Sequence, residues 1–261
     1  MRTFVMGDIH GACTAFRQCL QRAGFSYQND RLIVLGDIVD RHDEVAECVE
    51  ELLKIPNLIA IRGNHDDWFD EYCQTGRHPG DWNYGGLATV ASYLGQGGSK
   101  RPKIPGGYAL TYILDPQMIP QSHRTFFSTM QPYYIDDEGK CFVHAGFNRF
   151  APFTGQHPSI YYWDRELWAS AWEWQNNHHL DPEPPPFEMK TSFKEVYLGH
   201  TPTIRWNVTV PMQGANVFNL DTGAGHKGKL TIMDVETKMF WQSDRVPDLT
   251  SSAHPSSNSI R

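Results

Sequence analysis

Five short apolar stretches of this chain each end at a glycine-flanked aspartate, asparagine or histidine, and this pattern limits the possible folds more than any other feature. The segments at their ends are Gly7-Asp8-Ile9-His10-Gly11, Gly36-Asp37-Ile38-Val39-Asp40-Arg41, Gly63-Asn64-His65-Asp66, His144-Ala145-Gly146 and Gly199-His200-Thr201. In an open α/β sheet, ligands bind at the carboxyl ends of the strands, so these segments are expected to converge. Their glycines let the backbone turn sharply and come close to a bound group.

Strands and helices alternate in the first third of the chain. Apolar runs predict strands at residues 3–6, 32–35 and 58–61, and amphipathic periodicity predicts helices at 14–23 and 43–55. This order predicts parallel strands joined by right-handed crossovers.

The rest of the chain carries more dispersed signals. Helical patterns lie near 87–94 and 120–130, and strands are predicted at 140–143 and 195–198. Three later strands, which we expect to form a second sheet joined by a turn, lie at 217–220, 230–234 and 239–242.

The chain of 261 residues is long enough for a substantial core, and we expect one domain over residues 1–246. Glycine-rich and tryptophan-rich segments near 74–107 and 148–187 are expected to be loop or cap insertions. Residues 247–261 are rich in serine and proline and are expected to form a disordered tail.

Charge and cysteine content exclude several classes of protein. Lys and Arg number 23 against 30 Asp and Glu, so the net charge of −7 opposes a nucleic-acid coat or a polybasic membrane binder. The five cysteines lack CxxC spacing, which predicts reduced, packed thiols. No apolar run reaches the length of a membrane span, and the first residues carry no apolar signal region. We therefore expect a cytoplasmic protein.

The side chains in the five segments are donors typical of a metal site. They offer carboxylate and amide oxygens and imidazole nitrogens without a thiolate, from Asp8, His10, Asp37, Asn64, His144 and His200. Such mixed sets suit Mn, Fe, Zn or Ni better than calcium or a structural zinc site. Two cations about 3.5–4 Å apart can share a carboxylate and activate water against a phosphoryl group.

In this order and spacing, the five segments resemble the calcineurin-like metallophosphoesterase superfamily. The resemblance is to its phosphoprotein-phosphatase branch, with bacterial and phage-like serine/threonine phosphatases, whose motifs are GDxHG, GDxVDRG and GNH[ED] followed by two separated histidines. It spans residues 7–200 and continues through Asn219-Leu220-Asp221-Thr222-Gly223-Ala224. It implies an α/β fold in which two sheets form a sandwich flanked by helices, in four layers ordered α/β/β/α.

The resemblance also implies a dinuclear metal centre. The first divalent ion is then held by Asp8, His10 and Asp37. Asp37 bridges to the second ion, whose other ligands are Asn64, His144 and His200. Manganese is the expected metal, with iron, zinc and nickel as alternatives.

Four further residues take catalytic roles by resemblance. His65 is the general acid for the leaving oxygen, and Asp40 orients it and keeps it protonated. Arg41 clamps the phosphoryl oxygens with its planar fork. Arg165, in a W-x-R segment like that of phage-type members, is the second clamp, and Arg149 is an alternative for that position.

The implied reaction is hydrolysis of phosphoserine or phosphothreonine, with phosphotyrosine as a further substrate, by direct attack of a metal-bridging hydroxide. Phosphorylated proteins, peptides or small phosphoesters are the expected partners. Two departures bear on this reading, because His42 replaces the usual glycine and Asp66 the usual glutamate. GNHD is common in diadenosine tetraphosphate hydrolases, which gives the main alternative. A non-catalytic metal-dependent binding module is a further alternative, although it needs neither His65 nor Arg41.

Overall fold

The first of two sheets is built around parallel strands, as predicted. The computed structural model describes the chain except residues 81, 83, 96–113, 181–182, 184 and 253–261. The sheet has the order β10-β9-β1-β2-β3, with bounds Phe240–Gln242, Thr231–Asp234, Thr3–Met6, Arg31–Val34 and Leu58–Ala60. Strands β1, β2 and β3 run parallel, whereas β9 is antiparallel to both β1 and β10.

The second sheet also has a parallel centre. Its order is β4-β5-β6-β8-β7, with bounds Tyr133–Ile135, Lys140–Val143, Glu195–Leu198, Val217–Asn219 and Met212–Gly214. Strands β5, β6 and β8 are parallel, and β4 and β7 pair antiparallel at the two edges.

The expectation that strands 217–220, 230–234 and 239–242 share one sheet is wrong. The hairpin of β9 and β10 pairs with β1 in the first sheet, whereas β8 lies in the second. Both faces of β9 are covered, since Ile232 packs toward the helices and Met233 packs between the sheets. Turn residues predict a hairpin, but which sheet edge the hairpin joins depends on this long-range burial.

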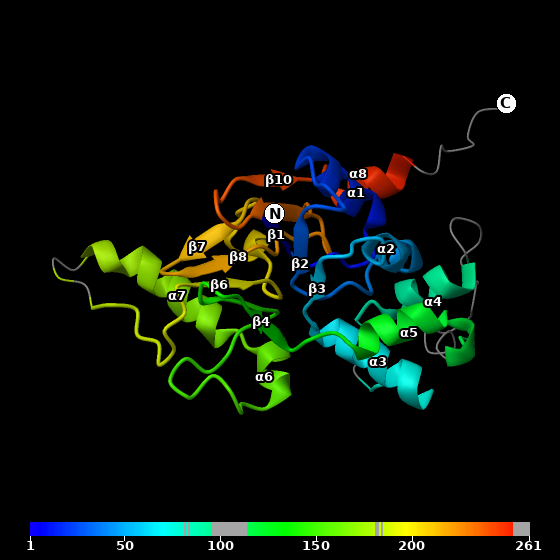
Figure 1. The fold of residues 1–261 in the computed structure, drawn as a ribbon, viewed down its shortest axis with the longest axis horizontal. Coiled ribbons are helices and arrows are strands. Elements are labelled where there is room, and N and C mark those ends of the chain that lie inside the picture. Colours follow the sequence, from blue (N-terminus) through cyan, green and yellow to red (C-terminus); the bar gives the residue numbers. More distant parts are fainter. Residues whose placement is uncertain (81, 83, 96–113, 181–182, 184, 253–261) are drawn as a thin grey trace.

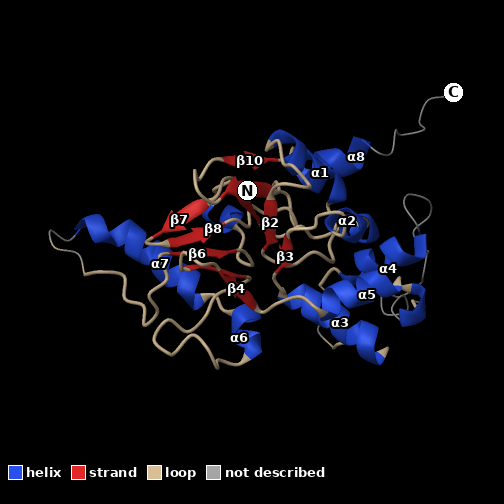
Figure 2. Cartoon of the chain, in the orientation of Figure 1, coloured by secondary structure: helices blue, strands red, loops and turns tan. Residues whose placement is uncertain are grey.

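Helices cover the outer faces of both sheets. Figure 1 shows α2, α3, α4 and α5 gathered on one side of the strands and α7 on the other, and Figure 2 separates helices from strands by colour. The helices of the first sheet are α1 Cys13–Arg22, α2 Val45–Leu52, α3 Asn64–Thr75, α4 Gly86–Gly95, α5 Gln121–Ser128 and α8 Val246–Ser252. The second sheet packs against α6 Pro158–Trp163 and α7 Glu166–Asn177. Short 3₁₀ helices are η2 Pro116–Met118, η3 His178–Leu180 and η4 Thr203–Trp206.

A separate apolar core lies between the two sheets. Val5 and Ile33 of the first sheet face this core together with aromatic residues of the second. The rings of Phe142, Tyr197 and Phe218 stack across three neighbouring strands, with centroids 4.9 and 5.1 Å apart. The predicted four-layer α/β/β/α sandwich is therefore confirmed.

Two segments expected to be irregular are helical where the structure describes them. The expected cap at 148–187 contains α6 and α7, and Trp168 on α7 is fully buried against the second sheet. The first residues of the expected tail belong to α8, Val246–Ser252. This helix is anchored by Val246, which is buried in the core on the helical side of the first sheet. Residues 253–261 and part of the predicted 74–107 insertion lie outside the described residues.

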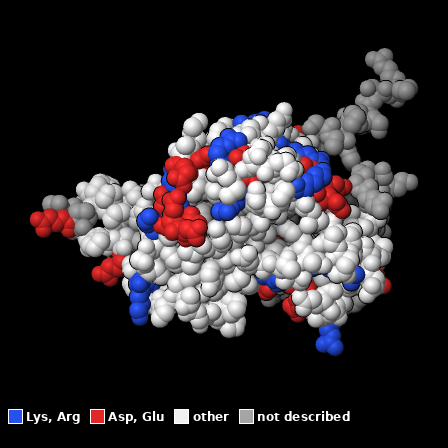
Figure 3. Space-filling view, viewed as in Figure 1, with Lys and Arg blue, Asp and Glu red and all other residues white. Residues whose placement is uncertain are grey.

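The surface and the thiols agree with the charge and cysteine analysis. Figure 3 shows basic and acidic side chains lying close together, without a broad basic field on that face. All five cysteines are buried and unpaired. Among the described helices, none combines the length and apolarity that a membrane span needs.

Replacement of Phe142 by alanine is expected to lower the free energy of unfolding by about 3–5 kcal/mol, because it leaves a cavity between the sheets. Urea denaturation measures this loss. Phe240→Ala is the control, since Phe240 is 41 % exposed and its removal is expected to cost no more than about 1 kcal/mol. Equal losses in the two variants would show that the ring stack does not stabilise the sandwich.

Candidate metal centre

The carboxyl ends of the parallel strands of both sheets meet in one place. The backbone carbonyl of Asp37, after β2, accepts the backbone amides of Ile9 and His10 from the loop after β1, at 3.1 and 2.7 Å. Across the sheets, the amide of His200 donates to the carboxylate of Asp8 at 3.1 and 3.2 Å. The six predicted ligands are 0–8 % exposed, and they lie at the ends of β1, β2, β3, β5 and β6.

His10 and Asp37 belong to the first donor group, whose third member is His65 rather than the predicted Asp8. Nε2 of His10 lies 3.6 Å from Oδ2 of Asp37, which is longer than a good hydrogen bond. The other ring nitrogen, Nδ1, donates to the carbonyl of Val39 at 3.0 Å, which leaves a lone pair on Nε2. A nitrogen lone pair facing a carboxylate at this distance suits a cation between them.

Asp37 also belongs to a second donor group with His144 and His200, whose ligating atoms lie within 4.8 Å of one another. Nδ1 of His144 donates to the carbonyl of Leu35 at 2.8 Å, so its Nε2 is free to bind a cation. This Nε2 lies 3.1 Å from both Oδ1 of Asn64 and Nδ1 of His200, and 3.5 Å from Oδ1 of Asp37. The structure thus places Asp37 between two groups, as the bridging assignment requires.

Buried negative charge gathers beside these imidazoles. Burial, and then the charges of Asp221 and Asp37, raise the pKa of Asp8 well above its usual range. Burial likewise raises the pKa of Asp221 to about 7. Such a cluster is costly without a compensating positive charge. The donor set therefore fits the divalent cations that were expected.

Asp221 was not among the predicted site residues. It follows β8, which is parallel to β6, so it reaches the same sheet edge as His200. Its position in the Asn219-Leu220-Asp221 segment, at the end of an apolar strand, was the available signal.

Left-handed backbone concentrates at the candidate site. Eight described non-glycine residues have a positive φ, and five of these are predicted site residues: His10, Asp37, Asp40, Arg41 and His200. Two glycines allow close approach, because a Cβ at Gly63 would collide with the carboxylate of Asp37 and one at Gly199 with that of Asp8. Strain of this kind persists where surrounding contacts over-determine the backbone.

His65 and Asp40 form a hydrogen-bonded pair beside the donor groups. Nδ1 of His65 lies 2.6 Å from Oδ2 of Asp40, and Nε2 lies 4.0 Å from Oδ2 of Asp37. Burial by itself lowers the pKa of His65, but the charge of Asp37 and the hydrogen bond to Asp40 outweigh it and raise the pKa overall. Burial thus opposes a charged ring, whereas the neighbouring carboxylates favour it.

Two residues that the sequence analysis missed hold Asp40 in place. Nε1 of Trp82 donates to both carboxylate oxygens at 3.1 Å, and the hydroxyl of Thr89 donates to Oδ1 at 2.6 Å. Asp40 is completely buried, so these donors satisfy a charge that water does not reach. Neither residue lies in a recognisable motif.

The three candidate arginines lie in different surroundings. Arg165, just before α7, donates to the hydroxyl of Thr201 at 2.9 Å, which places it beside His200. Arg41 is exposed next to Asp40, and in the described part of the chain its guanidinium makes no hydrogen bond. Arg165 thus lies beside a predicted ligand, and the charge of Arg41 acts on His10 and His65, where it lowers the pKa of each.

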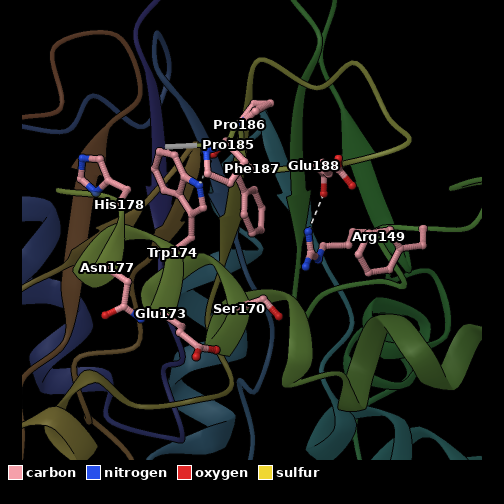
Figure 4. Close-up of a pocket in the computed structure, with 11 residues that line it drawn as sticks. Arg149, Ser170, Glu173, Trp174, Asn177, His178, Pro185, Pro186, Phe187 and Glu188 are labelled. Atoms are coloured by element: carbon pink, nitrogen blue, oxygen red, sulfur yellow. Dashed lines mark hydrogen bonds between the residues drawn. The ribbon is translucent and has the colours of Figure 1, made fainter. Parts of the chain in front are cut away.

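Arg149 lies elsewhere. Its guanidinium donates to the carbonyl of Glu188 at 2.7 Å and lies 4.2 and 4.7 Å from the ring centres of Phe150 and Phe187. Figure 4 shows Arg149 among the residues that line a pocket, with Trp174 on α7. The pocket has a volume of about 520 Å³, and the residues that line it include none of the predicted ligands. Arg149 is therefore not part of the candidate metal centre.

Asp66 and His42, the two residues that depart from the family motif, make hydrogen bonds between loops. Asp66 is fully buried, and its carboxylate accepts the amides of Ile38 at 2.9 Å and Gly63 at 3.0 Å. Nε2 of His42 lies 3.0 Å from the carbonyl of Ala224.

Donors from both sheets therefore converge on one shared carboxylate, which is an arrangement that could hold metal ions. Residues 1–203 match the calcineurin-like phosphoesterases, and the chain belongs to this family of metal-dependent phosphoester hydrolases.

Three relatives show how far the likeness extends. The chain is 38 % identical over 68 residues to a symmetrical bis(5'-nucleosyl)-tetraphosphatase of Haemophilus ducreyi, covering 25 % of each protein. It is 36 % identical over 63 residues to serine/threonine-protein phosphatase 1 of Salmonella typhimurium, covering 24 % of this chain and 29 % of the relative. These matches span about a quarter of the length of the curated relatives. A solved structure assigned provisionally as a diadenosine tetraphosphatase has a TM-score of 0.62 at 17 % identity and covers 92 % of both chains, which supports the fold.

Asp37→Asn is expected to lower the bound divalent metal from two ions per chain toward one or none, because it removes the charge that both donor groups share. Elemental analysis after dialysis measures the occupancy. Asp30→Asn is a matched control, since Asp30 is equally buried and pairs with Arg2 away from the site. Two ions in Asp37→Asn would contradict the shared carboxylate.

Proposed function

We propose that this chain is a phosphomonoesterase that removes phosphate from serine, threonine and tyrosine side chains of proteins and peptides. The observation that carries the proposal is the His65–Asp40 pair at 2.6 Å, placed directly beside the two donor groups. A site that only binds metal does not need a proton donor at this position. The pair indicates instead a reaction in which a poorly leaving alkoxide must be protonated.

The roles of the surrounding residues follow from their positions. We propose that two divalent ions, most suitably manganese, would be bound by Asp8, His10, Asp37, Asn64, His144 and His200. These ions would activate water and neutralise the charge of the phosphoryl group. Arg165, which is bonded to Thr201, and Arg41 bind the phosphoryl oxygens. His65 donates its Nε2 proton to the leaving oxygen, while Asp40 stabilises the charged ring.

Symmetrical hydrolysis of dinucleoside tetraphosphates is the second candidate function. It is favoured by the 38 % identity over 68 residues to the Haemophilus ducreyi enzyme. Asp66, the residue that prompted this alternative, is turned toward backbone amides. Its presence in GNHD therefore does not by itself distinguish the two substrates.

A parallel assay distinguishes the two functions. Metal-depleted protein resupplied with Mn²⁺ is expected to release phosphate from phosphoserine and phosphotyrosine peptides, and to cleave diadenosine tetraphosphate more slowly. Asp37→Asn serves as the inactive control. Cleavage confined to the dinucleotide would replace the proposed function with the second candidate.

His65→Asn is expected to reduce turnover of a phosphoserine peptide by about 10²–10⁴-fold, because the alkoxide leaving group needs a proton. The loss should be smaller with p-nitrophenyl phosphate, whose leaving group is stable without protonation. Steady-state rates on the two substrates provide the comparison. Equal losses would rule out His65 as the general acid.

A further inference from the structure

Two tryptophans connect the proposed proton donor to the second donor group. The ring of Trp68 lies 5.0 Å from that of His65, and the ring of Trp163 lies 5.2 Å from Trp68. Trp163 in turn lies 5.9 Å from the ring of His200. The four rings form a continuous aromatic chain from His65 to His200.

Trp163 presents a large apolar surface to solvent. It is 43 % exposed, whereas Trp168, only five positions further along the chain, is fully buried. Trp163 is therefore an exposed indole whose ring lies next to that of a predicted metal ligand, His200.

Trp163 is also held firmly in position. It is the last residue of α6, and the next residue, Asp164, accepts the amide of Leu167 at the start of α7 at 2.9 Å. Arg165, which follows, is fixed to Thr201. The indole and the phosphate-binding guanidinium are therefore two residues apart on one anchored segment.

The position of the proton donor determines where a leaving group lies. If His65 protonates the leaving oxygen, the atoms bonded to that oxygen must lie next to the His65 ring. Trp68 packs edge-on against this ring, and Trp163 extends the same surface. An aromatic ring attached directly to the leaving oxygen would lie next to this surface, and stacked or edge-on contacts of this kind are favourable.

We propose that Trp68 and Trp163 form a subsite for an aromatic leaving group, so that phosphotyrosine is preferred over phosphoserine. The proposal rests on the proposed phosphomonoesterase function and specifies its substrate class. The seryl side chain has no ring to place on the indoles. In symmetrical cleavage of a dinucleoside tetraphosphate, two phosphates and a ribose separate the base from the leaving oxygen, so the base lies beyond this surface.

The test uses three Mn²⁺-loaded variants and two peptides of identical sequence that carry either phosphotyrosine or phosphoserine. Trp163→Ala is expected to lower kcat/KM for the phosphotyrosine peptide about tenfold and for the phosphoserine peptide less than about threefold. Trp163→Phe should restore most of the loss. Trp174→Ala is the matched control, because Trp174 packs on His178 and Phe187 away from the metal centre.

A binding experiment tests the subsite without turnover. The Mn²⁺-loaded wild type is expected to bind phenylphosphonate at least about tenfold more tightly than methylphosphonate, and Trp163→Ala should lose most of this difference. Equal affinities, or equal losses on both peptides, would overturn the aromatic subsite. If the wild type hydrolyses neither peptide, the proposed function fails, while the phosphonate comparison still decides the subsite.

Discussion

One carboxylate, that of Asp37, connects the loops on which the rest of the site depends. The backbone carbonyl of the same residue, Asp37, accepts the amides of Ile9 and His10 from the loop after β1. Its side chain accepts the amide of His65, which begins the helix after β3, at 3.1 Å. The same carboxylate faces His10 from the first sheet and His144 from the second. Loss of the carboxylate would therefore release the amide of His65 and remove the donor atoms that both groups share.

The buried carboxylates around Asp37 both limit the stability of the candidate site and enable it to bind cations. Burial raises the pKa of Asp8 and Asp66, and the charge of Asp37 raises both further. The imidazoles reduce this cost only in part, because burial also lowers the pKa of His10 to about 3. Cations bound between these groups would compensate the carboxylates without protonating the imidazoles. Metal binding is then expected to stabilise the ends of both sheets together.

The sequence predicted the features that depend on neighbouring residues. Apolar runs ended by glycine gave the bounds of β1, β5 and β6, which the structure reproduces as Thr3–Met6, Lys140–Val143 and Glu195–Leu198. Convergence of the ligands followed because parallel strands end at one edge of a sheet.

Features that depend on distant contacts were not predictable in this way. The hairpin of β9 and β10 was recognised, but its pairing with β1 depends on burial across more than 200 residues of chain. Trp82 and Thr89 reach Asp40 from 42 and 49 residues away, and nothing in their local sequence marks them. The position of Asp221 after an apolar strand is a local indication of a site residue, but Asp221 is not part of the five segments that carry the resemblance to the family.

The same distinction applies to substrate choice. His42 and Asp66 are the positions where the sequence departs from the family motif, yet their side chains contact backbone groups of neighbouring loops. These two side chains therefore support the loop structure, and they do not form the surface that a leaving group would contact. The surface beside the proton donor comes instead from α3 and α6, through Trp68 and Trp163. Trp68 lies on the same helix as His65, and Trp163 lies two residues before Arg165, so the proposed leaving-group surface is built onto the elements that carry the site residues.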